Sequence, residues 1–438
     1  MTADDAVRGH LELTFRRRYA VVCAALLRQF GPRQLPLVED VVQDAMCRAV
    51  HVWARRGIPD DSTAWLIRVA YRLAIDRVRR DQRGERLNAV MLESRHIESA
   101  EPDAALTHEI RDAELRLLFT CADPTIPLEG QVALALSVMC GLGVTEIAGA
   151  LLTTPAAIHK RLQRAKRAMA DIGTVMDVSG QQAVTARLAS VHTMIYALFN
   201  EGYHGAHPQG PVKEDLCYEA VRLGESLLEL QACRTPSTYA LLALLALHAA
   251  RIPGRMGLTG DLEPLECQDR SHWDTDLIVR GMAWLKASAT GEVLTPYHLE
   301  AAIAAHHAVA RHYDATDWGT VRDLYQRLYA VAPSPMVALN RAIAVAQAEG
   351  PDAAYALLES LGTCVELQRA PFLDATKAEI ARRLGRFEEA RRRLERAIQF
   401  ARSRAEADFL TKRLDQWTAR WESTPSQAND AHLHRRTT

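Results

Sequence analysis

The chain has 438 residues, of which 48% are hydrophobic and 24% charged, and its formal net charge is −1 at pH 7. This length exceeds one compact core, so we expect at least two domains. The near-neutral balance excludes a chain that is basic throughout, so any nucleic-acid site must be local. No run of eighteen apolar residues and no signal-peptide segment is present, which predicts a cytoplasmic protein with no membrane contact.

Composition also predicts the fold class. Ala, Leu and Arg are abundant, and Gly and Pro fall between segments of helical periodicity, so the chain is predicted to be all-α. The eight cysteines are scattered and form no Cys-x-x-Cys pair. This spacing favours buried free thiols over a zinc site or a disulfide framework.

Residues 8–82 are predicted to form a first small helical domain. Gly31-Pro32 and Gly57-Ile58-Pro59 interrupt the apolar periodicity and mark the breaks between helices. The helices are expected at about 10–30, 36–55 and 62–81.

The second of these helices carries a polar acidic patch. Asp40, Gln43 and Asp44 lie at i, i+3 and i+4, which places them on one side of a helix. Beside a basic DNA-binding region, such a patch suits a basic protein partner. Solubility alone is the alternative explanation.

The third helix places basic residues around an aromatic ring. Its candidate residues for binding DNA are Arg68, Tyr71, Arg72, Arg79 and Arg80. Basic residues interleaved with an aromatic suit single-stranded or melted DNA, because bases stack on the ring. For Tyr71 a place in the core is an equal alternative.

A charged linker is expected at 83–105, followed by a second helical domain at 106–172 that ends in a pair of helices. The first helix of the pair is predicted at 144–151. Thr153 or Thr154 can cap the next helix, and Pro155 suits its first turn. Its buried stripe is expected to comprise Ile158, Leu162, Ala165 and Met169.

The other side of this helix is basic, with no acid between residues 155 and 170. In a helix-turn-helix, the recognition helix reads bases through its N-terminal residues and holds phosphates with its flanking basic residues. The alternative is a solvated basic face on an ordinary helical hairpin. The candidate DNA-binding residues are Thr154, Ala156, Ala157, His159, Lys160, Arg161, Arg164, Lys166 and Arg167.

A helical extension is predicted at 184–422, with a disordered tail at 423–438. Trp318, Asp352 and Phe387 begin similar segments 34 and 35 residues apart, a period typical of tetratricopeptide repeats, which we place at about 302–404. A generic array of helical hairpins is the alternative. Stacked repeats usually bind a peptide or another protein, whose identity the sequence leaves unknown.

Two polar stretches of the extension are candidates for chemical sites. "FNEGYHGAHPQG" contains Glu201, His204 and His207, but its glycines favour a structural loop with Asn200 and Glu201 capping helix ends over a metal site. "QDRSHWD" favours a salt-bridge network around a buried Trp273. No nucleophile–base pair or phosphate-binding loop is present, so we expect neither an enzyme nor a cofactor or metal site.

Several motifs together resemble the extracytoplasmic-function (ECF) class of sigma-70 family sigma factors. The first domain has Asp40-Val-Val-Gln43-Asp44 and the run from Ala64-Trp65-Leu66 to Arg79-Arg80. The second has Glu146-Ile147-Ala148, then Ile158 and "KRLQRAKRAM". The stretches 118–136, 196–210 and 262–278 look like a subgroup with a long helical extension that has tetratricopeptide-like repeats.

This resemblance implies two small sigma domains, region 2 and a helix-turn-helix region 4, followed by the repeats. Asp40, Gln43 and Asp44 would dock on the coiled-coil clamp in the largest subunit of core RNA polymerase. Residues 55–80 would engage the promoter −10 element, and the helix 155–168 would read the −35 element. Tyr71-Arg72 stands where many members have Arg-Asn, so the −10 sequence does not follow from the resemblance.

Three hypotheses follow. The chain is a sigma factor that initiates transcription, with an extension that regulates it through contact with the sigma domains or the polymerase. Alternatively, it is a DNA-binding regulator that works without polymerase, for which the patch Asp40, Gln43 and Asp44 has no use. The third is a repeat scaffold with a vestigial DNA module, which the intact basic helix argues against.

Overall fold

The computed structural model describes residues 18–84, 104–151, 153–178, 180–204, 212–255, 263–364, 367, 371–401 and 404–423. The regular structure in these ranges is helical and includes no strand, so the prediction of an all-α fold is confirmed. The chain divides into two compact units. Unit 1 comprises Met1–Gly205 and Lys213–Leu245, and unit 2 comprises Ala206–Val212 and Ala246–Thr438.

Unit 1 begins with helices that end at the predicted breaks. A helix ends at Phe30 and is followed by η1 (Pro32–Gln34), α2 (Leu35–Arg56) and α3 (Ser62–Gly84). Gly31 and Gly57 both adopt a φ of 79°, a conformation that favours glycine and ends each helix. The helices α2 and α3 pack together, and the rings of Trp53 and Trp65 meet edge to face at 5.3 Å.

Four helices follow in unit 1: α4 (Ala104–Cys121), α5 (Leu128–Cys140), α6 (Val144–Ala150) and α7 (Pro155–Ile172). The helix α5 is central, because every residue from Gly130 to Cys140 is buried. It contacts α4, α6 and α7. Its sequence, GQVALALSVMC, has no strongly polar face, which is the pattern of a helix surrounded by protein.

The remaining helices of unit 1 come from the predicted extension. They are α8 (Gln181–His204), α9 (Glu214–Leu227), η2 (Gln231–Cys233) and α10 (Pro236–Ala249), within which the boundary to unit 2 falls. The helix α8 packs on α5, α4 and α9. Unit 1 therefore contains the segments predicted as sigma domains together with the first part of the extension, whereas the expected domain limits at 82, 172 and 184 stay predictions.

The expected loop at 199–210 is wrong in its first half. The helix α8 continues to His204, so Asn200 and Glu201 lie inside it, and Glu201 is buried. A Cβ atom at Gly202 would lie 2.8 Å from the carbonyl oxygen of Lys213 and 2.8 Å from Cys217 Sγ. The glycine therefore serves close packing rather than a turn. His207 lies outside the described residues.

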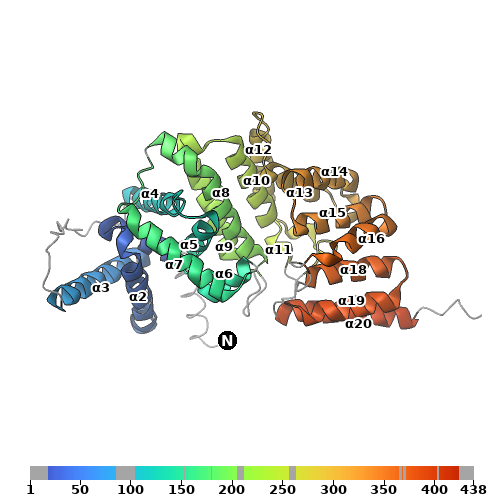
Figure 1. The fold of residues 1–438 in the computed structure, drawn as a ribbon, viewed down its shortest axis with the longest axis horizontal. Helices are drawn as coiled ribbons and strands as arrows, with labels where there is room; N and C mark the ends of the chain where they lie inside the picture. Colours follow the sequence, from blue (N-terminus) through green and yellow to red (C-terminus); the bar gives the residue numbers. More distant parts are fainter. Residues whose placement is uncertain are drawn as a thin grey trace, which may run out of the picture. The chain divides into compact units, whose positions relative to one another are not determined.

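Unit 2 is a succession of helices, drawn in yellow to red in Figure 1. It contains α11 (Ile252–Arg255), η3 (Arg270–His272), α12 (Thr275–Ser288), α13 (Pro296–Val309), η4 (Tyr313–Ala315), α14 (Trp318–Val331), α15 (Pro335–Ala348), α16 (Pro351–Ser360), η5 (Leu361–Thr363), α18 (Pro371–Arg383), α19 (Phe387–Gln399) and α20 (Arg404–Ser423). From α13 on, successive α-helices pack on one another. The helices α14, α16 and α19 begin within one residue of the three positions that define the 34-residue period. Their assignment as tetratricopeptide repeats stays a prediction.

Trp273 of unit 2 is buried, as expected, and its charged neighbours make several kinds of contact. The guanidinium carbons of Arg251 and Arg270 lie 5.4 and 4.9 Å from the centre of its ring, which are cation–π contacts. Asp269 and Asp274 accept hydrogen bonds from backbone amides and cap η3 and α12. Within the same stretch His272 Nδ1 lies 3.5 Å from Asp269 Oδ2, and the expected salt-bridge network stays a prediction.

Candidate nucleic-acid interface

The two helices α6 and α7 are joined by a short turn that side chains hold at both ends. Thr154 Oγ1 accepts a hydrogen bond from the amide of Ala157 at 3.3 Å, so Thr154 is the residue that caps α7. Glu146 Oε2 accepts from the amide of Gly143 at 3.0 Å and caps α6. The amide of Thr153 donates to the carbonyl oxygen of Ala148 at 2.9 Å, which closes the turn.

The apolar stripe of α7 is buried as its spacing predicts. Ile158, Leu162, Ala165 and Met169 are each at most 7% exposed. The helix packs on α5 and α6 through this side. These buried residues therefore fix which side of α7 faces outward.

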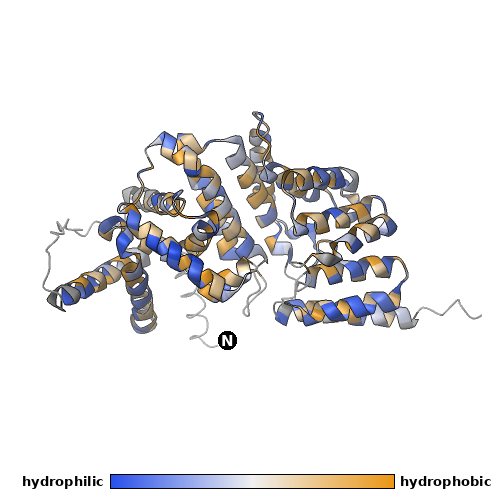
Figure 2. Cartoon of the chain, viewed as in Figure 1, coloured by the Kyte–Doolittle hydropathy of each residue, from blue (hydrophilic) through white to orange (hydrophobic). Residues whose placement is uncertain are grey.

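The outward side of α7 carries six of the nine residues expected to bind −35 DNA. They are Thr154, Ala156, His159, Lys160, Arg164 and Arg167, all exposed, and Ala157 lies at their edge, half-buried. Hydrophilic and hydrophobic colours alternate along α7 in Figure 2, as expected for a helix with one buried side. These residues make one basic surface, which we call the α7 stripe.

The other two residues of the nine are engaged in ion pairs. Arg161 Nη2 lies 2.6 Å from Glu129 Oε2, at the start of α5. Lys166 Nζ lies 2.6 and 2.9 Å from the two carboxylate oxygens of Glu39 in α2. Both basic side chains are at least 70% buried, so they lie on the flanks of α7 and outside the α7 stripe.

The acidic patch of α2 is on the surface but is partly neutralised. Gln43 is exposed, and the side chains of Asp40 and Asp44 are 66% and 49% exposed. Arg77 of α3 joins the two carboxylates, with N–O distances of 2.9 Å to Asp40 and 3.1 Å to Asp44. The three predicted residues thus share one surface with a cation between the two acids.

A second basic surface lies on α3. Arg68, Arg72, Arg79 and Arg80 are exposed. Tyr71 is half-buried, and its ring centre lies 5.6 Å from that of Phe30. Tyr71 therefore combines the two alternatives left by its sequence, because one side packs on the domain and part of the side chain reaches solvent.

The partners of these charges were not identified from the sequence. Glu39, Glu129 and Arg77 each pair with a predicted residue from another element. Local spacing does not indicate contacts made over 32 to 127 positions. The available sign of contacts between distant segments is the apolar composition of α5, because a helix without a polar face must be covered on all sides.

The described part of the chain contains no group of three His, Cys, Asp or Glu residues placed to hold a metal ion. None of its helices is long and apolar enough to cross a membrane. Five of the cysteines are buried, and burial raises the pKa of the Cys121 and Cys233 thiols to about 12. Such thiols are protonated at neutral pH and serve packing.

Comparison with known proteins gives the first part of this chain a family. Residues 15–84 match the model of sigma-70 region 2, and residues 187–289 match a family of unknown function (DUF6596). A protein of Rhizobium meliloti (strain 1021), "Uncharacterized protein R00370", is 38% identical over 413 residues, which are 94% of this chain and 96% of that protein.

The region 2 match covers α2 and α3, which carry the acidic patch and the second basic surface. The similarity to the Rhizobium protein extends through both units. Sigma-70 proteins are transcription initiation factors and not enzymes. The chain therefore belongs to the same family as the Rhizobium meliloti protein, and its match to region 2 over residues 15–84 supports a sigma factor of the sigma-70 family.

Proposed function

We propose that this protein is a sigma factor of the ECF type, which binds core RNA polymerase, recognises −35 and −10 promoter elements and initiates transcription. The observation that carries the proposal is that one chain combines a match to sigma-70 region 2 with the α7 stripe. A capped helix with a buried apolar side presents His159, Lys160, Arg164 and Arg167 outward, on a face without a carboxylate before Asp171. This is the surface that duplex DNA requires from a recognition helix.

Region 2 would supply the other two contacts. Asp40, Gln43 and Asp44 would dock on the clamp of the largest polymerase subunit, and their exposure on α2 supports this role. On α3, Arg68, Arg72, Arg79 and Arg80 would follow the backbone of the −10 strand, with Tyr71 beside them as a stacking platform. The exposed Ile58, in the loop between α2 and α3, would lie next to this surface.

The packed helices of unit 2 suit a protein or peptide ligand. They form successive hairpins, and hairpin arrays of this kind usually bind other proteins. We therefore propose protein binding for α13–α20 and a cytoplasmic location for the whole chain. A DNA-binding regulator that acts without polymerase is the second candidate, and the α7 stripe alone would favour it equally.

Binding to core polymerase separates the two candidates. The full chain is mixed with bacterial core RNA polymerase, and the complex is detected by size-exclusion chromatography. The variant Asp40→Arg with Asp44→Arg should lose the complex, because two cations would face a basic partner. A matched variant, Glu292→Arg with Glu395→Arg, reverses two exposed acids of unit 2 and should keep it.

A full-length chain that forms no complex would contradict the sigma assignment and leave the polymerase-independent regulator. Loss of the complex in both double variants would show that the net charge, not the α2 patch, drives binding. The purified complex would then select promoter fragments from a genomic library, and these fragments would give the −35 and −10 sequences.

A further inference from the structure

The helix α5 is covered on one side by α7 and on another by α8. Its buried residues include Leu134, Leu136, Val138 and Met139, each at most 4% exposed. The helices α4 to α7 could shield only part of this apolar surface. The rest of the cover comes from the extension, in the segment that matches the family of unknown function.

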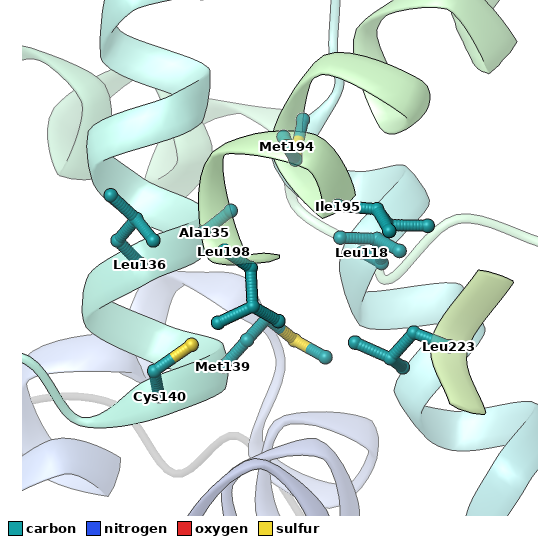
Figure 3. Close-up of a pocket in the computed structure, with 9 residues that line it drawn as sticks. All are labelled: Leu118, Ala135, Leu136, Met139, Cys140, Met194, Ile195, Leu198 and Leu223. Atoms are coloured by element: carbon teal, nitrogen blue, oxygen red, sulfur yellow. The ribbon is translucent and has the colours of Figure 1, made fainter. Parts of the chain in front are cut away.

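Figure 3 shows how closely the two segments interdigitate. Side chains from α4 and α5 point toward side chains from α8 and α9 around one small apolar gap. The gap encloses about 10 Å³, no more than the ~10–15 Å³ that a single water molecule needs, so it is a packing defect and not a ligand site. The side chains around it are Leu118, Ala135, Leu136, Met139, Cys140, Met194, Ile195, Leu198 and Leu223.

Three ion pairs join the same two segments of the chain, and all have the same polarity. Arg187 of α8 binds Asp123, and Arg222 of α9 binds Glu114 at 2.8 Å. Lys213 binds Glu146 at 3.1 Å. Each cation belongs to 181–245 and each acid to 104–172. Asp123 and Glu114 are 7% and 1% exposed, so each of these buried carboxylates depends on its guanidinium partner.

The pair of Lys213 and Glu146 reaches the DNA-facing helices directly. One carboxylate oxygen of Glu146 caps α6 through the amide of Gly143, while the other lies against Lys213 Nζ. The backbone of Lys213 is itself held, because its amide donates to the carbonyl oxygen of Gly202 at 2.8 Å. Lys213 thus fixes the Glu146 side chain that caps α6, and α6 packs on α7.

We infer that residues 181–245 are a structural part of the promoter-reading domain. They complete the core on which α6 and α7 rest, and Lys213 is a positioning residue for Glu146, which caps α6. This assigns a role to the first part of the segment of unknown function. The inference rests on the proposed function for its biological meaning, but the coupling itself is a property of the free protein.

Hydrogen exchange of the full chain, followed by mass spectrometry without DNA or polymerase, tests the coupling. The variant Leu198→Ala opens a cavity in α8, and a matched variant, Leu358→Ala, does so in the buried core of unit 2. If α5–α9 form one cooperative unit, Leu198→Ala raises exchange in α5, α6 and α7 together with α8, by at least ~10-fold. Leu358→Ala should leave α5–α7 unchanged. Faster exchange confined to α8 and α9 would overturn the inference.

Lys213 provides a milder test that does not threaten folding. Lys213→Gln should speed exchange at the first amides of α6 severalfold. Lys213→Arg should keep the exchange rates of the unaltered chain, because it keeps the cation beside Glu146. Unchanged exchange in Lys213→Gln would remove the positioning role. Because neither experiment uses polymerase, failure of the sigma assignment and failure of this inference give different results.

Discussion

Lys166 of α7 and Glu39 of α2 form an ion pair in which the amine lies 2.6 Å from one carboxylate oxygen and 2.9 Å from the other. The carboxylate is 14% exposed and the lysine 28%. Close by, Arg33 Nε of η1 donates to the carbonyl oxygen of Ala170. The helix proposed to read −35 DNA is therefore attached to region 2 by a flank that the α7 stripe does not use.

The first prediction compares Lys166, on the flank of α7, with Arg164 of the α7 stripe. Each lysine or arginine that neutralises a phosphate contributes about 0.9 to the slope of log affinity against log salt. Arg164→Ala should therefore lower the slope for duplex DNA by about 0.9, whereas Lys166→Ala should lower it by less than half as much, because Lys166 is already paired. Fluorescence anisotropy over roughly 50–200 mM salt measures both slopes.

Equal slopes for the two variants would mean that Lys166 leaves Glu39 when DNA binds. A matched control is Lys286→Ala, a lysine in α12 of unit 2, which should keep the slope of the unaltered chain.

The second prediction concerns the attachment itself. A hydrogen-bonded charge pair with this burial contributes about 1–3 kcal/mol, so Glu39→Gln should loosen α7 from α2. Spin labels on cysteines at Gln43 and Gln163, both exposed, report the distance between the two helices after the exposed Cys47 and Cys267 are changed to serine. Glu39→Gln should add a population at longer distance.

Glu129→Gln is the control for this measurement, because it removes the partner of Arg161 inside the helices α5 to α7. It should leave the distance between α2 and α7 as it was. A single, unchanged distance in Glu39→Gln would show that apolar packing and the Arg33 contact are sufficient.

The third prediction tests the cap of α7. Thr154→Ala removes the acceptor for the amide of Ala157 and should cost about 1 kcal/mol, which corresponds to roughly fivefold faster exchange at the first amides of α7. Thr154→Ser keeps the oxygen and should keep the protection. If the alanine variant exchanges at the original rate, Pro155 and the buried apolar residues of α7 are sufficient to hold the first turn without the cap.

Local features of this chain could be predicted from the sequence, because they depend on residues close in the chain. Helical periodicity predicts the buried apolar residues from Ile158 to Met169 and the cap beside Pro155. The conformation of glycine predicts the helix ends at Gly31 and Gly57. The candidate residues of α2 and α3 follow from the same periodicity, and apart from the half-buried Tyr71 they are on the surface.

Contacts between distant segments could not be predicted in this way. The pairing of Lys166 with Glu39 spans 127 positions, and Gly202 suggested a loop although it lies where α8 meets Lys213. A glycine that permits close packing and one that permits a turn look alike in a single sequence. The apolar stretch of α5 is typical of a fully covered helix, but it does not tell which segment provides the cover.

The last prediction is a pH dependence that comes from His192. Its Nε2 lies 2.9 Å from Thr238 Oγ1, between α8 and α10, and burial lowers its pKa to about 4 from an ordinary value of about 6.5. Between these pH values the unfolded chain binds a proton that the folded chain does not. Stability is therefore complete above about pH 6.5 and is lost as the pH falls toward 4, by up to ~3 kcal/mol.

The variant His192→Gln keeps an amide that can bond Thr238 but has no titrating group. Its urea midpoint, followed by circular dichroism, should depend less on pH between about 6.5 and 4 than that of the unaltered chain. Burial also lowers the pKa of His307 in unit 2, to about 3, so part of the dependence should remain. His272→Gln, at an exposed position, is the control. An unchanged pH dependence in His192→Gln would mean that acid opens unit 1 through its carboxylates instead.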